Sequence, residues 1–178
     1  MDGCVEDDVC HENAFLYNES GTHKVEMGHP ISYILWLDLQ AFAEWLGARL
    51  PTESEWEYVA RSQGQDVKYP WGDTEPDCAY ADFDFNNEYC RGRSTSKVCL
   101  TPLGNTEQAL CDLGGNIYEW VQDHYNSQIA EIPLDGAGAC SDASGCPINA
   151  SNVADRVLRG GNWNDSASGI RAATRGNG

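Results

Sequence analysis

Apolar residues recur at helical spacing in the segment that follows His29-Pro30. The residues that share one side of such a helix are Leu35, Leu39, Phe42 and Leu46, and Trp45 widens this apolar side. Gly47 comes next and is typical of a residue that ends a helix. The pattern predicts a first helix over about residues 37–46.

A second helix is predicted directly after Arg49-Leu50-Pro51, which breaks the first pattern. Thr52 and Glu55 have the spacing of a capping box, in which each side chain accepts a hydrogen bond from the other residue's backbone N–H. The helix is expected to run to about residue 61 and to bury Trp56, Val59 and Ala60.

Two short stretches have the alternation of strands. In residues 117–121, Tyr118 and Trp120 point one way and the other three residues point the other way. Residues 156–159 predict a second strand, which ends at Gly160-Gly161. Residues 1–30 read as an irregular, disulfide-tied segment, and residues 73–116 and 126–155 read as long polar loops.

Length and charge narrow the class of protein. The 178 residues predict one domain over residues 1–178. Eleven Lys and Arg against 28 Asp and Glu give a net charge of −17, which disfavours nucleic acid and anionic membranes as partners and favours cations. No apolar run is long enough for a membrane span, and the first residues do not read as a signal peptide, so a leader for export would lie outside this sequence.

The eight cysteines fall into four close couples, and none forms the C-x-x-C motif of redox or zinc sites. The couples predict disulfides and leave the full connectivity open: Cys4–Cys10, Cys78–Cys90, Cys99–Cys111 and Cys140–Cys146. Disulfides indicate an oxidising location, so we expect the protein to be extracellular, periplasmic or at the cell surface.

The most suggestive stretch is residues 112–120, where two glycines lie between carboxylates and aromatic residues. Gly114-Gly115 permits a tight turn that brings Asp112 and Glu119 together and aims carbonyl oxygens inward. Carboxylate and carbonyl oxygens are the ligands that Ca²⁺ prefers. A plain turn into a strand explains the same residues, and this stretch taken alone favours the turn.

Four phrases in order resemble the formylglycine-generating enzyme, or sulfatase-modifying factor, family. They are RLPTESEWEY at residues 49–58, YPWGD at 69–73, GNIYEW at 115–120 and VLRGGNW at 157–163. The resemblance covers roughly residues 29–175. It implies an α+β fold of the C-type lectin-like kind, with two helices packed on a small twisted antiparallel sheet and long irregular loops braced by disulfides.

The resemblance also implies structural Ca²⁺. Carried over position by position, the ligands are the side chains of Asp112 and Glu119 and the carbonyl oxygens of Gly115 and Ile117. A second family site implies the Asp82 side chain and the Phe83 carbonyl. Residues 95–97, which should complete that second site, hold no carboxylate, and Asp84 or Glu88 are the available substitutes.

Oxidase activity of the family's aerobic enzymes is not expected. The resemblance implies that those enzymes bind copper through two cysteines just after the segment that matches residues 160–163. In this sequence no cysteine follows Cys146. The family's first strand and helix and its closing strand also have no counterpart in the sequence. The sequence is therefore expected to be either a fragment or a compact variant. Open sheet edges invite pairing, so a compact variant is expected to have its sheet completed by a partner or a homo-oligomer.

The resemblance therefore predicts a non-catalytic recognition module that binds a glycan, a peptide or a protein. Its long loops carry aromatic residues that could be exposed: Tyr80, Phe83, Phe85 and Tyr89. Residues 162–178, rich in Asn, Ser and Gly, also resemble the variable end of ligand-binding proteins diversified by retroelements. We expect a structural role, holding the sheet ends together, for Arg159, Trp163, Arg171 and Arg175. The alternatives are an enzyme of another chemistry on the same scaffold and a structural subunit of a surface complex.

Overall fold

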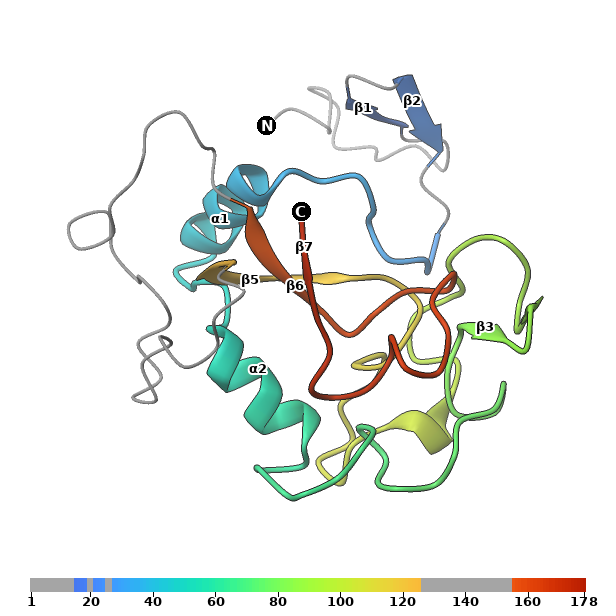
Figure 1. Ribbon diagram of the computed structural model, residues 1–178. Coiled ribbons are helices and arrows are strands. Elements are labelled where there is room, and N and C mark those ends of the chain that lie inside the picture. The colour runs from blue at the N-terminus through green and yellow to red at the C-terminus, as the bar shows by residue number, and fades with distance from the viewer. Residues whose placement is uncertain (1–14, 19–20, 25–26, 126–154) are drawn as a thin grey trace.

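The fold combines two helices with three small antiparallel sheets, as shown in Figure 1. The computed structural model describes residues 15–18, 21–24, 27–125 and 155–178. Helix α1 (Trp36–Trp45) and helix α2 (Glu53–Ala60) lie beside a three-stranded sheet with the order β5 (Glu119–His124), β6 (Arg156–Arg159) and β7 (Arg175–Asn177). Two hairpins, β1 (Phe15–Asn18) with β2 (Gly21–Lys24) and β3 (Asp84–Phe85) with β4 (Glu88–Tyr89), and the 3₁₀ turn η1 (Pro102–Gly104) complete it. The predicted α+β class is confirmed.

Helix α2 forms where the capping box predicts it. The Thr52 hydroxyl accepts from the Glu55 backbone N–H at 3.2 Å, and the Glu55 carboxylate accepts from the Thr52 N–H at 2.8 Å. Trp56 and Ala60 are buried and Val59 packs beside them, as expected from the apolar spacing. α2 therefore packs on β5 and β6 through its predicted side.

Helix α1 also matches its prediction within one residue at each end. It is joined to the sheet at its first turn, where the Trp36 indole donates to the Val121 carbonyl at 2.8 Å. From β5, the Trp120 indole donates to the Ile34 carbonyl at 3.1 Å. Ala43 is the one residue of the helix that is buried.

The strands differ from the prediction in three places. β6 forms as predicted, but β5 begins two residues after residue 117 and continues to His124 with an irregularity in its pairing. Arg175–Asn177, for which no strand was predicted, pairs with β6 as β7, although Gly and Asn have low strand preference. Likewise, part of the supposedly irregular first 30 residues forms the β1–β2 hairpin, in which Phe15-Leu16-Tyr17 are good strand formers.

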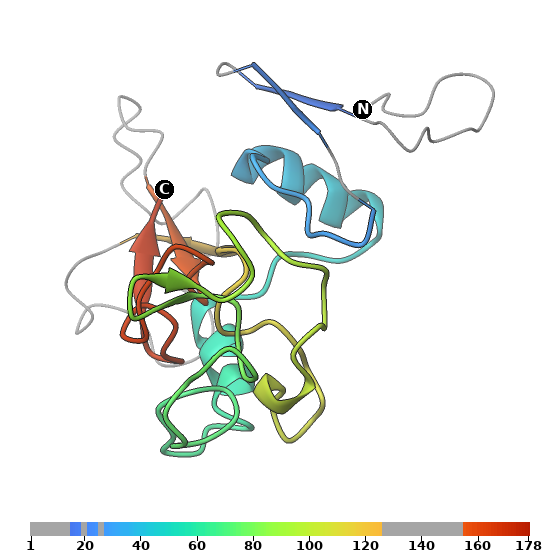
Figure 2. The same ribbon diagram turned by 90° about the vertical axis from the view of Figure 1, so that its right-hand side faces the viewer.

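Two apolar clusters form the core, and residues 112–119 run between them. The first consists of Trp56, Ala60, Leu113, Val121, Val157 and Ala172, and the second consists of Tyr69, Ala81, Phe83 and Ile170. Phe83 was expected to be exposed and is fully buried, because its ring belongs to the second cluster. Figure 2 shows the long loops gathered on one side of the molecule, next to the sheet.

Buried charge ties α2 to the sheet. Arg159 is fully buried and donates to the Glu57 carboxylate at 2.6 Å, while Arg175 donates to both oxygens of Glu53 at 2.5 and 2.8 Å. These contacts have the structural role expected of both arginines. Arg171 is exposed, which contradicts the same expectation for that residue.

Two of the predicted disulfides are present, Cys78–Cys90 and Cys99–Cys111. The other two couples, Cys4 with Cys10 and Cys140 with Cys146, lie outside the described residues. Such bonds form in an oxidising compartment.

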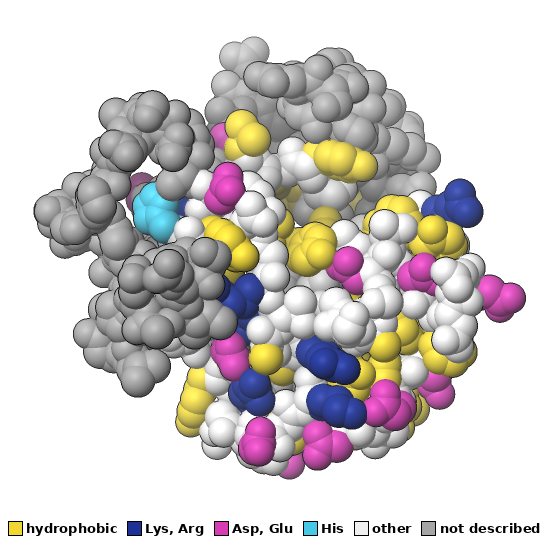
Figure 3. Space-filling model, in the orientation of Figure 1, with side chains coloured by type: hydrophobic (Ala, Val, Ile, Leu, Met, Phe, Trp, Pro, Cys, Tyr) yellow, Lys and Arg dark blue, Asp and Glu magenta, His cyan; other side chains and the backbone are white. Residues whose placement is uncertain are grey.

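Among the described residues, neither helix has the length and apolar character required to cross a membrane. On the face in Figure 3, Asp and Glu side chains are spread over the surface.

Candidate functional site

Residues 112–119 adopt a turn that three left-handed backbone conformations create. The φ angles of Asp112, Gly115 and Asn116 are 60°, 89° and 63°. Asn and Asp tolerate this region better than most residues, and Gly occupies it freely. Gly115 is also required by space, since a Cβ there would collide with the carbonyl oxygen of Asp82. The turn therefore presses residue 115 against residue 82.

Asn116 connects this turn to two other segments, and sequence reasoning missed it. Its side chain accepts from the Ser96 N–H at 3.0 Å and donates to the Ser96 carbonyl at 3.3 Å. Its backbone N–H donates to the Asp82 carbonyl at 2.8 Å, and its carbonyl accepts from the Trp163 N–H at 3.1 Å. Asn116 is 2% exposed, so these bonds replace water. An Asn directly after two glycines was the available signal.

The two predicted carboxylates face the same region. The Glu119 carboxylate accepts from the Trp56 indole N–H at 2.5 Å, and the Asp112 carboxylate accepts from the Cys99 N–H at 2.8 Å. Burial raises the pKa of Glu119 to about 7, against the effect of the Trp56 hydrogen bond, and the charge of Asp112 raises it further. The two acids are thus close enough to repel each other, which is the electrostatic situation that a cation relieves.

The backbone oxygens of the turn are consistent with the predicted ligand set. The Asn116 carbonyl is occupied by Trp163. By contrast, no backbone N–H in the described part of the chain donates to the carbonyls of Gly115 or Ile117. These two carbonyls are therefore open to another partner, and carbonyl and carboxylate oxygens are the donor atoms that a hard cation such as Ca²⁺ takes.

Asp82 is a further buried acid next to this turn. The residue is 3% exposed, and neither of its carboxylate oxygens has a hydrogen-bond partner among the described residues. Burial raises its pKa, Ser96 and Arg91 oppose the rise, and Asp112 adds to it. The Phe83 carbonyl, which the resemblance pairs with Asp82, already accepts from the Cys90 N–H at 3.1 Å. Asp84 has one buried carboxylate oxygen without a partner, whereas Glu88 is exposed.

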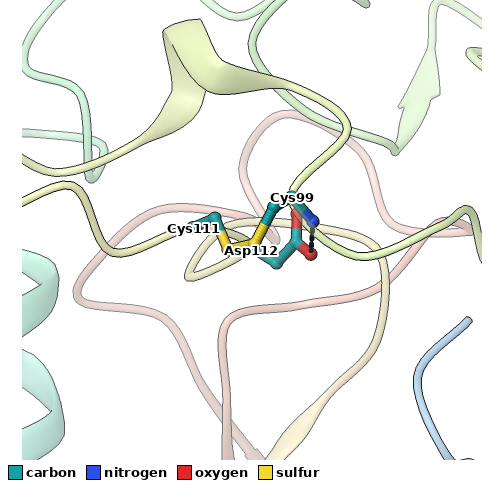
Figure 4. Close-up of side chains that lie close together, drawn as sticks. All are labelled: Cys99, Cys111 and Asp112. Atoms are coloured by element: carbon teal, nitrogen blue, oxygen red, sulfur yellow. Dashed lines mark hydrogen bonds between the residues drawn. A yellow bond between two sulfur atoms is a disulfide. The ribbon is translucent and has the colours of Figure 1, made fainter. Parts of the chain in front are cut away.

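Three side chains of the kinds that bind metals lie close together at the turn, but they do not form a metal site with cysteine thiolate ligands. Cys99, Cys111 and Asp112 bring ligand atoms within 4.8 Å of one another. Figure 4 shows that the two sulfur atoms are bonded to each other and that the Asp112 carboxylate receives the Cys99 N–H. A disulfide has no free thiolate to offer a metal, so the disulfide positions Asp112 and does not itself bind a metal.

A second surface is built from the β3–β4 hairpin and the loop of residues 162–168. The rings of Tyr89 and Trp163 are 5.7 Å apart, and the Tyr89 hydroxyl donates to the Asn164 side chain at 3.2 Å. The Arg93 guanidinium lies 5.1 Å from the centre of the Tyr89 ring. Phe85 is 37% exposed at the end of β3. We call these five residues the hairpin–loop surface.

Hydrogen bonds within the loop hold this surface in shape. The Asp165 carboxylate accepts from the Asn162 N–H at 2.9 Å, and the Asn162 side chain accepts from the Asn164 N–H at 2.7 Å. The Asp165 carbonyl accepts from the Asp84 N–H at 2.9 Å, which attaches the loop to β3. The Trp163 N–H donates to the Asn116 carbonyl. This bond connects the hairpin–loop surface directly to the turn of residues 112–119, which we call the acidic turn.

Comparison with known proteins gives the family. A model of the sulfatase-modifying factor enzyme 1-like domain matches residues 8–178. The chain belongs to this family. The similarity extends to inactive C-alpha-formylglycine-generating enzyme 2 of Bos taurus, which is 32% identical over 178 aligned residues that cover 92% of this chain and 57% of that protein.

Two further relatives show how widely the domain of the sulfatase-modifying factor family is used. The serine/threonine-protein kinase pkn1 of Chlamydia caviae is 32% identical over 163 residues, which cover 90% of this chain and 24% of the kinase. The solved structure of Treponema denticola variable protein 1 matches with a TM-score of 0.54 and 32% identity, over 72% of this chain and 41% of that one. The chain thus spans between a quarter and three fifths of the length of these relatives.

For this member of the sulfatase-modifying factor family, the structure gives each predicted residue a place. Asp112 and Gly115 lie in the turn, Glu119 begins β5 directly after it, and the Asp82 backbone packs against Gly115. The hairpin–loop surface includes Phe85 and Tyr89, two of the four aromatic residues predicted to be exposed. Residues 164–171, where the resemblance implied the copper cysteines of the oxidases, contain Asn, Asp and Ser and no Cys.

Proposed function

We propose that the chain is a non-catalytic recognition module whose hairpin–loop surface binds a ligand and whose acidic turn is braced by Ca²⁺. The observation that carries the proposal is the contact of Tyr89 with Asn164 and Trp163. It combines aromatic rings and an amide on one ordered surface, in a loop without the cysteines of an oxidase. The similarity to a relative named inactive C-alpha-formylglycine-generating enzyme 2 supports this proposal over oxidase activity.

The composition of the surface favours a glycan or peptide ligand. Tyr and Trp offer large contact areas at low entropic cost, and Asn and Ser supply adaptable hydrogen bonds, as in other binding surfaces. Arg93 adds a single cation to a chain whose net charge is −17. A strongly anionic ligand is therefore disfavoured, because the field of the whole chain repels it.

Calcium supports the surface through the acidic turn. A cation at Asp112 and Glu119, completed by the carbonyls of Gly115 and Ile117, would neutralise the two acids and hold Glu119 ionised. Asn116 connects the turn to the hairpin–loop surface, because its carbonyl accepts a hydrogen bond from the Trp163 N–H. The turn thus fixes the loop that carries the surface.

A second cation at Asp82 belongs to the same proposal. Two buried carboxylate oxygens without hydrogen-bond partners in the described residues are costly unless a cation or a proton is present. The ligands would include the Asp82 side chain and the second lone pair of the Phe83 carbonyl, and Asp84 is the acid that could complete them.

Ligand binding is tested with a glycan and peptide array on the Ca²⁺-loaded protein. Trp163→Ala and Tyr89→Ala should abolish the array signal, whereas Tyr58→Ala, which removes an aromatic ring that is 55% exposed on α2, should not. Thermal melting of each variant separates lost binding from lost folding. Copper-dependent oxidation of a cysteine peptide by the protein would overturn the proposal.

The calcium brace is tested separately by chelation and metal counting. Chelator should lower the melting temperature. Asp112→Ala and Glu119→Ala should lower it by part of that amount, and chelator should lower it further only by the share of the ion at Asp82. Calorimetric titration should count two Ca²⁺ ions in the wild type and one in Asp82→Asn. A melting curve that chelator leaves unchanged would rule out the brace while leaving the array result to be judged on its own.

A further inference from the structure

The outward side of α1 presents large apolar side chains to solvent. Leu37, Trp45 and Leu46 are 64%, 75% and 58% exposed, and Phe42 is 45% exposed. Leu37, Ala41 and Trp45 are four residues apart and form one line along the helix. The rings of Phe42 and Trp45 are stacked with centroids 5.9 Å apart. These five residues are called the outer face of α1.

The outer face is not used to hold α1 in the fold. The helix is attached on its other side, where Ala43 is buried and the Trp36 indole reaches the Val121 carbonyl. Figures 1 and 2 both show α1 on one side of the sheet, and in Figure 2 the β1–β2 hairpin lies beyond the helix. Contiguous exposed apolar surface of this kind is rare on monomeric proteins and marks interaction sites.

The charged residues of α1 and of the segment just before it have one sign. Residues 27–46 include Asp38 and Glu44 but no Lys or Arg. The nearest arginine in sequence, Arg49, is bound to Glu55 through two hydrogen bonds of 2.7 Å. Arg156 lies over the Trp36 ring at 3.6 Å and donates to the Gln122 carbonyl, on the attached side of the helix. The outer face is therefore apolar with an acidic rim.

This charge pattern decides between the possible occupants. A second copy would bring the same Asp38 and Glu44 and a further net charge of −17. Residues 1–14 contain five Asp or Glu, residues 126–154 contain three, and neither stretch contains Lys or Arg. Like charges repel across an interface, so none of these complements the rim.

We infer that the outer face of α1 docks a protein partner that presents apolar side chains flanked by Lys or Arg. Burial of the apolar side chains on both partners supplies affinity, and the basic flanks select the partner and speed its approach. This docking surface uses neither the hairpin–loop surface nor the acidic turn, so it stands independently of the recognition function.

The experiment uses the full chain and two synthetic helical peptides. One peptide carries a Leu face flanked by Lys, and the matched peptide replaces every Lys by Glu. Calorimetry at about 50 mM salt should show binding of the Lys peptide at least tenfold tighter than that of the Glu peptide. Raising the salt to about 300 mM should narrow the difference, because it shortens the screening length.

A charge-neutral variant separates specific docking from general attraction to an acidic protein. Leu37→Ser with Trp45→Ser keeps the net charge and should weaken the Lys peptide at least tenfold, with an unchanged melting temperature. Leu103→Ser, at a residue 60% exposed in η1, is the matched control and should bind like the wild type. Equal binding of both peptides, full binding by the double variant, concentration-dependent dimerisation through this face, or adsorption to phosphatidylcholine vesicles through Trp45 would each overturn the inference.

Discussion

Replacing Glu53 by Gln tests whether the buried ion network stabilises the fold. Glu53 is 5% exposed and binds Arg175 with both carboxylate oxygens, at 2.5 and 2.8 Å. The same carboxylate lies 3.7 Å from Nε of Arg159, a fully buried guanidinium. Gln keeps the shape and removes the negative charge, so two arginines lose a shared partner at once.

The expected cost follows from the burial of this network. Removing one partner of a buried ion pair destabilises by about 3–5 kcal/mol, because the remaining charge stays in a medium of low polarity. Arg159 keeps its bond to Glu57 at 2.6 Å and its bonds to the carbonyls of Thr174 and Ala172. We therefore expect Glu53→Gln to lower the free energy of unfolding by about 3 kcal/mol, the lower end of this range.

Urea unfolding at neutral pH measures this loss, followed by both tryptophan fluorescence and far-UV circular dichroism. The matched control is Glu75→Gln, since Glu75 pairs with Lys68 at 2.7 Å and its side chain is 74% exposed. That exposed pair should contribute less than about 1 kcal/mol. If Glu53→Gln costs no more than Glu75→Gln, the network does not stabilise the fold and the reasoning from burial is wrong.

Three further predictions concern the turn and the cap of α2. Gly115→Ala should destabilise by more than Gly47→Ala: both residues have positive φ, which costs about 1 kcal/mol in Ala, but a Cβ at Gly47 meets nothing within 4 Å. Asn116→Ala should lower the free energy of unfolding by about 2–4 kcal/mol, because it leaves the buried Ser96 backbone groups unpaired. If it lowers the free energy of unfolding by less than an Asn→Ala change at an exposed position does, the prediction is wrong. The hydrogen bond from Arg49 lowers the pKa of Glu55 to about 2 from the ordinary value of 4.5. The ionised Glu55 therefore stabilises the fold above pH 4.5, and this contribution should decline as the pH falls from 4.5 toward 2. Since Glu55 is exposed, that decline should be under about 1 kcal/mol in acid titrations, and Glu55→Gln should remove it.

Structural features that depend on neighbouring residues could be predicted from the sequence, and α2 shows why. Its capping box and the burial of Trp56 depend on residues within one helical turn of each other, so the order of residues contains the information. β7 is the opposite case. Arg175-Gly176-Asn177 has no preference for a strand, and its pairing with β6 depends on a segment about 18 residues away.

The connections that shape the candidate site were also out of reach of local patterns. Asn116 bonds Ser96 across 20 residues, and Tyr89 bonds Asn164 across 75. The turn itself could be predicted because Gly114-Gly115 is visible in the sequence, and the structure has positive φ angles at Asp112, Gly115 and Asn116. What the sequence could not show is that the turn and the hairpin–loop surface share a hydrogen bond, from Trp163 to Asn116.

The fold deals with its buried and half-buried acids in two different ways, and the contrast bears on the proposed metal. The buried Glu53 and the half-buried Glu57 are neutralised by guanidinium groups at 2.8 Å or less. Among the described residues, no ion pair involves Asp82, Asp112 or Glu119. The Glu119 carboxylate accepts from the Trp56 indole, and the Asp112 carboxylate accepts from the Cys99 N–H and the Asn116 amide. A chain with a net charge of −17 must meet such acids with protons or with a cation. At neutral pH a proton is held weakly by a carboxyl with a pKa of about 7, so a divalent cation is the better neutraliser, and it is the role that Ca²⁺ has in this proposal.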